Sequence, residues 1–407
     1  MIIETTMKLL VFILLYAVVA NAWLPDDHGL FDKRGRLSKP HSTYSRKIRG
    51  VNLGSLFVVE PWMIPKEWAN MGCEGTNSEF DCVKALGQRK ANKAFQDHWN
   101  NWFTEKDMDK MVSFGLNTLR IPLGFWLSES LVHADEYFPQ GALPVLERVC
   151  DWAAERGFYV ILEMHGAPGA QTAWQAFTGK WVEEPGFYNA SEYARAYKFL
   201  GWLTKLIHTK RSFRTVGMIG VINEPNWDEP SILDEFYPNA YSKIRSVESS
   251  LRVKKNDALH IQYMDSKWGA GNPNRNLTNT YHTAYDNHRY LKSDTTVVVS
   301  QEGYLSASCN DNLIVPGETP LIVGEWSLGP KTSEEHSPEF QVADDANKGF
   351  YIKWWAAQVL AYEKGLGWTF WSWKTELNND YRWSYLEAVE AGVIKMNPDK
   401  AYTIGAC

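Results

Sequence analysis

Short apolar runs alternate with longer amphipathic segments along most of the chain. The runs have the length and the β-branched and aromatic content of buried strands, and the longer segments repeat apolar positions every three or four residues, as helices do. The predicted strands are Val51–Val58, Thr118–Pro122, Tyr159–His165, Met218–Asn223, Leu259–Met264, Tyr285–Tyr290, Leu321–Trp326 and Thr369–Trp373. Helices are predicted between most of them, for example Lys106–Phe114, Leu143–Arg156, Glu192–His208, Tyr237–Leu251 and Lys348–Lys364.

The alternation of strands and helices predicts a parallel sheet. Eight such units in 407 residues, without a glycine-rich dinucleotide-binding fingerprint, favour an α/β fold of the (β/α)8 (TIM) barrel type over an open sheet. Neither a repeat nor a low-complexity linker divides the chain. We therefore predict one domain over residues 23–407, which begins with a polar, irregular arm that ends near residue 48.

The first 22 residues have the pattern of a secretory signal peptide. Lys8 supplies positive charge, Leu9–Ala20 is uninterruptedly apolar, and Ala20-Asn21-Ala22 fits the small-x-small cleavage pattern. The apolar run has 12 residues, fewer than the roughly 20 that a membrane-spanning helix needs. We expect a secreted, extracellular protein, free or held in a cell wall, with no membrane association after signal removal. Its candidate N-glycosylation sites are Asn189-Ala190-Ser191 and Asn276-Leu277-Thr278.

Composition narrows the class of ligand. Lys and Arg total 42 against 48 Asp and Glu, for a net charge of −6, so the basic face of a nucleic-acid-binding protein is not expected. The chain holds 19 Trp, more than core packing alone requires, and flat indoles suit the apolar faces of sugar rings. The tryptophans therefore favour a carbohydrate ligand.

Five cysteines follow the predicted signal peptide, and secretion permits disulfides. Cys73 and Cys82 flank a short polar loop, which predicts a disulfide between them, and Cys309 with Cys407 is a second candidate pair. Cys150 lies in an apolar helical stretch and is predicted to be a buried thiol. No CxxC pair or Cys/His spacing indicates a zinc site.

Several predicted strands end in polar, ionisable or aromatic residues. These are Arg120, His165, Asn223, Glu224, His288, Glu325 and Trp373. In a (β/α)8 barrel, active-site residues lie where the strands run into the following loops. Because the core of such a barrel is apolar, polar residues that converge on one rim indicate a functional site.

Two of these residues are carboxylic acids on the fourth and seventh predicted strands. Glu224 follows an apolar strand and precedes Pro225, and Glu325 ends another apolar strand. The two strands lie on opposite sides of the barrel mouth. Cleavage of a glycosidic bond needs two carboxyl groups, one that protonates the leaving oxygen and one that attacks the sugar or activates water.

The motifs around these strand ends resemble glycoside hydrolase family 5, and within it the fungal β-glucanases. They are Arg49-Gly50-Val51-Asn52-Leu53-Gly54, Glu60-Pro61-Trp62, Arg120-Ile121-Pro122, His165-Gly166-Ala167-Pro168-Gly169, Ile222-Asn223-Glu224-Pro225, Gly324-Glu325-Trp326-Ser327 and Trp371-Ser372-Trp373-Lys374. They occur in order over nearly the whole predicted mature chain. The resemblance implies a retaining mechanism without cofactor or metal, in which Glu224 is the acid/base and Glu325 the nucleophile.

The resemblance also implies roles for the surrounding residues. Arg120 would keep Glu325 ionised, and Asn223 would hydrogen-bond the 2-hydroxyl of the sugar. His288 and Tyr290 match the His-x-Tyr of the family, near the acid/base and the nucleophile respectively, and His165 would bind a sugar hydroxyl. Trp373 would be the stacking platform, with Trp371 as the alternative on the same predicted strand face. Glu60 and Glu163 are further carboxylates that could bind sugar hydroxyls.

Two subgroups of the family are candidates. Exo-acting β-1,3-glucanases carry an Asp ten residues after the position of His165, where this chain has Gln175. They also carry Gly-Trp directly after the position of Gly54, where this chain has Ser55-Leu56. The segments that resemble the endo-β-1,6-glucanases are Ala22-Trp23-Leu24-Pro25, Met71-Gly72-Cys73, Asp81-Cys82, Leu259-His260-Ile261-Gln262, Asp286-Asn287-His288-Arg289-Tyr290 and Tyr381-Arg382-Trp383-Ser384.

We therefore expect a monomeric endo-β-1,6-glucanase whose partner is a β-glucan polysaccharide. Exo-β-1,3-glucanase and β-glucan transglycosylase activities are the alternatives, the latter because sugar can replace water in attacking the covalent intermediate. A non-catalytic glucan-binding protein would lack one of the two glutamates, and both are present.

Overall fold

The computed structural model describes residues 47–266, 272–312, 319–343 and 345–407. The predicted signal peptide and nearly all of the N-terminal arm lie outside these residues. Eight parallel strands pair in chain order and close into a barrel, as predicted. The strands are β1 (Ile48–Asn52), β2 (Thr118–Gly124), β3 (Tyr159–Gly166), β4 (Val216–Gly220), β5 (His260–Met264), β6 (Thr283–Arg289), β7 (Leu321–Trp326) and β8 (Gly367–Phe370).

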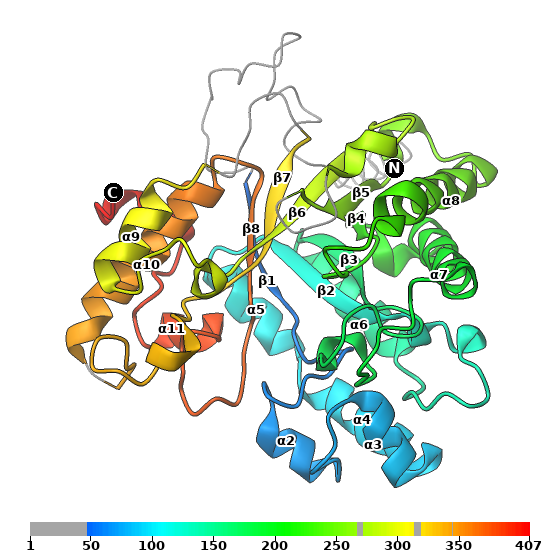
Figure 1. The fold of residues 1–407 in the computed structure, drawn as a ribbon, viewed down its shortest axis with the longest axis horizontal. Coiled ribbons are helices and arrows are strands. Elements are labelled where there is room, and N and C mark those ends of the chain that lie inside the picture. Colours follow the sequence, from blue (N-terminus) through cyan, green and yellow to red (C-terminus); the bar gives the residue numbers. More distant parts are fainter. Residues whose placement is uncertain (1–46, 267–271, 313–318, 344) are drawn as a thin grey trace, which may run out of the picture.

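Helices surround the strands, with α9 and α10 on one side of the view and α7 and α8 on the other (Figure 1). The helices of the β/α units are α5 (Glu105–Ser113), α6 (Leu143–Glu155), α7 (Ala190–Thr209), α8 (Tyr237–Ser250), α9 (Gln301–Cys309) and α10 (Asp345–Tyr362). A π-helical turn, η7 (Ile232–Phe236), leads into α8. The other helices are α2 (Pro65–Asn70), α3 (Glu79–Leu86), α4 (Gln88–Asn101) and α11 (Tyr385–Glu390). Among the described residues, every helix is too short or too polar to cross a membrane.

Three strands begin earlier and end at least three residues earlier than the apolar pattern predicted. The strand expected at Val51–Val58 is Ile48–Asn52, the one at Met218–Asn223 is Val216–Gly220, and the one at Thr369–Trp373 is Gly367–Phe370. The reason is visible after β1, where an apolar turn is fully buried without belonging to the sheet. In this barrel, hydrophobicity reports burial, and the loops at the mouth are buried as well as the strands.

Both candidate disulfides are present, which confirms the predicted pairs. Cys73 and Cys82 join the loop before α3 to that helix, with their Cα atoms 5.0 Å apart. Cys309, the last residue of α9, bonds to Cys407 at the C-terminus, with Cα atoms 5.5 Å apart. Cys150 is a buried free thiol in α6, as predicted.

An ion-pair cluster closes the barrel at the end where the strands begin. Arg49 on β1 donates Nε to Oε1 of Glu363 at 2.6 Å and Nη2 to Oε2 at 2.9 Å, and its Nη1 pairs with Asp399 at 2.6 Å. The Tyr402 hydroxyl and the Trp368 indole also donate to the Glu363 carboxylate, at 2.7 and 3.2 Å. Arg49 and Glu363 are both buried, so this cluster fastens the C-terminal segment to β1 and β8.

Candidate active site

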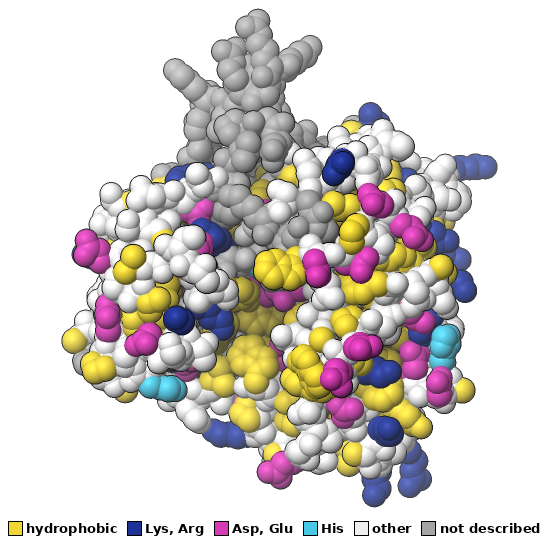
Figure 2. Space-filling model, viewed as in Figure 1, with side chains coloured by type: hydrophobic (Ala, Val, Ile, Leu, Met, Phe, Trp, Pro, Cys, Tyr) yellow, Lys and Arg dark blue, Asp and Glu magenta, His cyan; other side chains and the backbone are white. Residues whose placement is uncertain are grey.

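Ionisable side chains from several strands converge at the opposite end of the barrel. β2, β3, β6 and β7 contribute Arg120, His165, His288 and Glu325, all of them buried. Glu224 reaches the same place from the loop after β4, with 18% of its side chain exposed. Figure 2 shows the surface hollowed near the centre of one face, with hydrophobic side chains along the hollow and acidic ones beside it.

Glu325 is held through both of its carboxylate oxygens. Nη1 of Arg120 donates to Oε1 at 2.8 Å, and the hydroxyl of Tyr290 donates to Oε2 at 2.8 Å. Burial and the negative charges of Glu325 and Glu224 raise the pKa of Tyr290 well above its ordinary value, so its hydroxyl stays protonated and remains a donor. The carboxylate therefore has a fixed orientation.

Burial raises the pKa of Glu325 above its ordinary value, and the nearby Glu224 adds to the rise. The charges of His288 and Arg120 act in the opposite direction and favour the ionised form. The predicted role of Arg120, to hold Glu325 ionised, matches this direction. The positive charges beside Glu325 thus oppose the effect of burial, which disfavours the ionised form of the carboxyl group.

Glu224 lies close to Glu325 but has a different environment. One carboxylate oxygen of each residue and one nitrogen of His288 all lie within 4.8 Å of one another. Nδ1 of His288 contacts Oε1 of Glu224 at 2.6 Å, and it lies 3.6 Å from Oε2 of Glu325. One carboxyl group is thus buried and clamped by donors, whereas the other is partly open to solvent.

Two asparagines align Arg120 with the carboxylates. Nη1 of Arg120 donates to Oδ1 of Asn52 at 2.9 Å, and Nη2 donates to Oδ1 of Asn223 at 3.0 Å. Asn52 in turn donates Nδ2 to the backbone carbonyl of Gly324 at 2.8 Å, directly before Glu325. Arg120 is therefore oriented by β1, by the loop after β4 and by the strand that carries Glu325.

His288 is positively charged at neutral pH. Burial alone would lower the pKa of its imidazole, but the charges of Glu325 and Asp286 and hydrogen bonds to Asp286 and Glu224 raise it to about 10. Asp286 precedes His288 by two residues and shares its strand face. The side chain of Asp286 fits because its neighbour on β7 is Gly324, where an added Cβ would come within 2.0 Å of Oδ1.

His165 sits between a carboxylate and an indole. Its Nδ1 lies 3.0 Å from Oε2 of Glu163, and its ring stacks on Trp371 with a centroid separation of 5.6 Å and an interplanar angle of 8°. Burial acts to lower the pKa of His165, but the charge and hydrogen bond of Glu163 together with the charge of Glu325 raise it above its ordinary value. Glu163 also lies 3.4 Å from Arg120, so it joins His165 to the ionisable side chains around Glu325.

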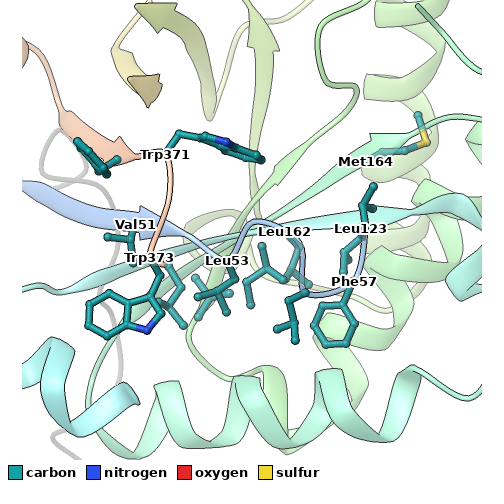
Figure 3. Close-up of a cluster of buried hydrophobic side chains, with 14 of the residues drawn as sticks. Val51, Leu53, Phe57, Leu123, Leu162, Met164, Trp371 and Trp373 are labelled. Atoms are coloured by element: carbon teal, nitrogen blue, oxygen red, sulfur yellow. The ribbon is translucent and has the colours of Figure 1, made fainter. Parts of the chain in front are cut away.

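The position of Trp373 corrects the predicted stacking platform. Its indole is 2% exposed, donates Nε1 to Asp107 of α5 at 2.9 Å and packs 5.9 Å from the ring of Phe114. Figure 3 shows the indoles of Trp371 and Trp373 on opposite sides of the chain, with Trp373 among Val51 and Leu53. The expectation that both share a strand face fails because β8 ends at Phe370, before either residue.

Glu60 comes from the loop after β1 and lies at the same end of the barrel. The indole of Trp62 donates to Oε2 of Glu60 at 2.8 Å, whereas Oε1 is buried without a hydrogen-bond partner among the described residues. Burial raises the pKa of Glu60 to about 7, opposed by the charge of His165. This carboxyl group can accept or donate a hydrogen bond near neutral pH.

Some site residues were not predicted from the sequence. Asp286 could have been found from His288 by the rule that residues two apart on a strand share a face. Trp383 lies in a motif that carried no predicted role, yet its ring lies 5.5 Å from Trp62 and 6.0 Å from Tyr290. Its place depends on a loop after β8 that has no periodic pattern.

Comparison with known proteins places this geometry in a family. The model of "Cellulase (glycosyl hydrolase family 5)" matches residues 83–377, most of the described barrel. The chain belongs to glycosyl hydrolase family 5. It is therefore a glycoside hydrolase built on a closed eight-stranded barrel.

Relatives and solved structures agree with this membership. The chain is 50% identical over 402 residues to "Glucan endo-1,6-beta-glucosidase B" of Emericella nidulans, with 96% of this chain and 97% of the relative covered. "Glucan 1,3-beta-glucosidase" of Blumeria graminis is 29% identical, with 89% and 90% covered. The crystal structure of rutinosidase from Aspergillus niger shares the fold with a TM-score of 0.68 at 18% identity, over 88% of this chain and all of that one.

Proposed function

We propose that the protein hydrolyses internal β-1,6 linkages of β-glucan with retention of configuration. The observation that carries the proposal is the pair Glu224 and Glu325, whose nearest carboxylate oxygens lie within 4.8 Å of each other. Retaining glycosidases place their carboxyl groups about 5–5.5 Å apart, whereas inverting enzymes leave about 6.5–9.5 Å for a water molecule. The short separation supports direct attack by one carboxylate.

The contacts of each carboxyl group support the roles of the pair. Glu325 is oriented by two donors and faces two cations, which suits a nucleophile that must be ionised. Glu224 is the more exposed of the two and contacts His288, which suits a group that exchanges its proton with the leaving oxygen and then with water.

In the first step, the carboxylate of Glu325 forms a bond to the anomeric carbon as the bond from that carbon to the glycosidic oxygen breaks. The leaving oxygen takes the proton of Glu224, and a glycosyl-enzyme forms. In the second step, Glu224 takes a proton from water, the water oxygen bonds to the anomeric carbon, and Glu325 leaves. Two inversions at one carbon give net retention.

Neighbouring residues would bind the sugar. Arg120 occupies Oδ1 of Asn223, which leaves the amide nitrogen of Asn223 to donate to the 2-hydroxyl. The unpartnered Oε1 of Glu60 would accept from another hydroxyl. We assign the stacking role to Trp371, because Trp373 is turned into the core.

The substrate assignment rests on the relative whose printed name is an endo-1,6-beta-glucosidase, at 50% identity, against 29% for the 1,3-beta-glucosidase. It is also supported by Gln175, which is exposed and uncharged where the exo-acting subgroup carries an Asp. A site without that carboxylate lacks one means of closing the pocket around a chain end. Internal cleavage needs such an open site.

Product analysis on linear β-1,6-glucan beside linear β-1,3-glucan tests the proposal. We expect a ladder of short β-1,6-linked oligosaccharides at early times, detected by chromatography, and little release from β-1,3-glucan. The Glu325→Ala variant is the control for contaminating glycosidases. Release of glucose alone, from β-1,3-glucan alone, would contradict the assignment.

We further propose that the protein is a secreted monomer processed after residue 22. The apolar run before Ala22 and the two disulfides support secretion. N-terminal sequencing of protein from the culture medium should begin at Trp23, and size-exclusion chromatography with light scattering should give the mass of one chain. An intact N-terminus or a stable dimer would count against this proposal.

A further inference from the structure

Three side chains outside the catalytic pair hold the backbone that carries Glu224. The hydroxyl of Thr172 donates to the carbonyl of Glu224 at 2.6 Å. Nε2 of Gln171 donates to the carbonyl of Asn223 at 3.0 Å. The hydroxyl of Tyr188 accepts from the amide of Asn226 at 2.6 Å and donates to the carbonyl of Gln171 at 2.5 Å.

These contacts join the segment after β3 to neighbouring peptide groups of the loop after β4. Gln171 is fully buried and also donates Nε2 to the carbonyl of His165 at 2.6 Å, while its Oε1 accepts from the amide of Ala167 at 3.1 Å. The loop after β3 is thus tied to the strand that carries His165 and to the loop that carries Glu224. Each of the three side chains uses its hydrogen-bonding groups on backbone atoms, as a positioning device does.

Glu224 needs such support because its backbone is left-handed. Its φ is 37°, in a region where the Cβ of an L-residue is crowded and where few non-glycine residues occur. Such a conformation persists when surrounding contacts over-determine it. The carbonyls of Asn223 and Glu224 and the amide of Asn226 are each bound, on both sides of the left-handed residue.

We propose that Gln171, Thr172 and Tyr188 are positioning residues that aim the carboxyl group of Glu224 at the leaving oxygen. The proposal rests on the proposed acid/base role of Glu224. The carboxyl group of Glu224 itself contacts His288 at 2.6 Å. The three residues fix the position of the Glu224 backbone, and hence whether the proton on its carboxyl group reaches the leaving oxygen.

This role has a chemical signature that a purely structural role lacks. Proton donation matters for a leaving group that is a strong base and hardly matters for one that is a weak base. Loosening the backbone of Glu224 therefore slows cleavage of phenyl glycosides much more than cleavage of 2,4-dinitrophenyl glycosides. A general loss of folded protein or of sugar binding slows both equally.

The experiment compares kcat/KM of the full chain on phenyl and 2,4-dinitrophenyl β-gentiobiosides. The test variants are Thr172→Val and Tyr188→Phe, which remove one hydroxyl each. The matched controls are Thr178→Val and Tyr193→Phe, because the Thr178 hydroxyl bonds to the backbone of Gln175 and Lys180 within its own loop and Tyr193 bonds to Ser231. We expect the test variants to lose about tenfold or more on the phenyl substrate and less than about threefold on the dinitrophenyl substrate.

The controls should change both substrates by the same small factor, and Thr172→Ser should restore most of the loss because it keeps the hydroxyl. An equal loss on both substrates, or no loss, in Thr172→Val and Tyr188→Phe would overturn the positioning role. If Thr172→Val fails to fold, as judged by thermal unfolding, Tyr188→Phe and Thr172→Ser decide. Failure of the unmodified protein on both substrates and on β-1,6-glucan would instead count against the proposed function.

Discussion

The barrel holds a buried arginine near each of its two ends, and the surroundings of the two differ. Arg49, where the strands begin, forms a two-pronged pair with Glu363 and a third bond to Asp399. Glu363 receives further hydrogen bonds from Tyr402 and Trp368. All three nitrogens of the Arg49 guanidinium and both oxygens of the Glu363 carboxylate therefore have hydrogen-bond partners.

At the mouth, Arg120 is surrounded by more negative charge than it can match. Burial acts to lower the pKa of Arg120, but the charges of Glu163, Asp286 and Glu325 together raise it. The carboxyl groups of Glu60 and Glu224 also lie close to Glu325. Several buried atoms there have no hydrogen-bond partner among the described residues. They are Nε of Arg120 and one carboxylate oxygen each of Glu60, Glu163 and Asp286.

The difference separates a structural centre from a functional one. A buried ion pair that is fully hydrogen-bonded is costly to break, because the remaining partner becomes an unpaired buried charge. Buried polar atoms without partners are rare in proteins, and where they gather they mark a place that a ligand completes. The comparison therefore predicts activity losses at the mouth and stability losses at the other end.

The largest expected effect is the loss of activity on removing either carboxyl group at the mouth. Glu325→Ala should lower kcat by about a thousandfold or more, and Glu224→Ala by about 10²–10⁴-fold for substrates with poor leaving groups. Neither change should lower the thermal unfolding midpoint much, because each relieves crowding among like charges. Kinetics on β-1,6-glucan together with calorimetry measure both. A large loss of stability with little loss of kcat would contradict a functional role for the mouth.

At the other end, Arg49→Met should destabilise the fold by about 3–5 kcal/mol while activity per folded molecule at low temperature is unchanged. The matched control is Lys110→Met, which breaks an exposed pair with Glu390 and should cost about 0–1 kcal/mol. Urea unfolding gives the two free energies. Equal effects of the two substitutions, or a selective loss of kcat in Arg49→Met, would contradict a structural role for this cluster.

Glu79 is a third case, a buried carboxyl group without a cation among its interacting partners. Burial raises its pKa to about 8, against the opposing hydrogen bond from the amide of Val59. The folded protein then holds a proton that the unfolded chain loses near pH 4.3, so stability falls as pH rises from about 4.3 to about 8. Glu79→Gln should remove most of this fall, on the order of 2–4 kcal/mol. Unfolding free energies at pH 5 and pH 8 measure it, and an unchanged pH dependence would refute it.

The smallest expected effect concerns His288 beside Glu325, the proposed nucleophile. His288 opposes the burial that raises the pKa of Glu325, so His288→Gln should raise that pKa further. Because the nucleophile works only when ionised, the acid limb of the kcat/KM profile should move to higher pH, by about one unit. The profile is measured on a dinitrophenyl substrate, which needs little help from Glu224. A limb that stays in place or moves to lower pH would show that His288 does not set this ionisation.

The sequence predicted the barrel and the site to different depths. Residues on strands, such as Arg120, His165 and Glu325, follow from the alternation of strands and helices, because strand ends meet at one rim. The bounds of β1, β4 and β8 were displaced because the loops that follow them are also apolar and buried.

The loop residues of the site carry no such pattern. The direction of Trp373 depends on its hydrogen bond to Asp107, and the place of Gln171 depends on contacts with two backbone segments far apart in the sequence. Both are tertiary contacts that neither hydrophobic period nor motif spacing contains. The resemblance to a family implied the roles of Glu224 and Glu325, and the structure adds the contacts that orient these two residues.

The proposed nucleophilic role of Glu325 can be tested by trapping the glycosyl-enzyme and locating the attached sugar. Incubation with an activated 2-deoxy-2-fluoro β-glucoside, whose intermediate hydrolyses slowly, should add one sugar to the folded protein, detected by mass spectrometry. After proteolysis, we expect the label on the peptide that contains Glu325, and no label in the Glu325→Ala variant. A label on Glu224 or Glu60, or an inverted product without any covalent adduct, would contradict it.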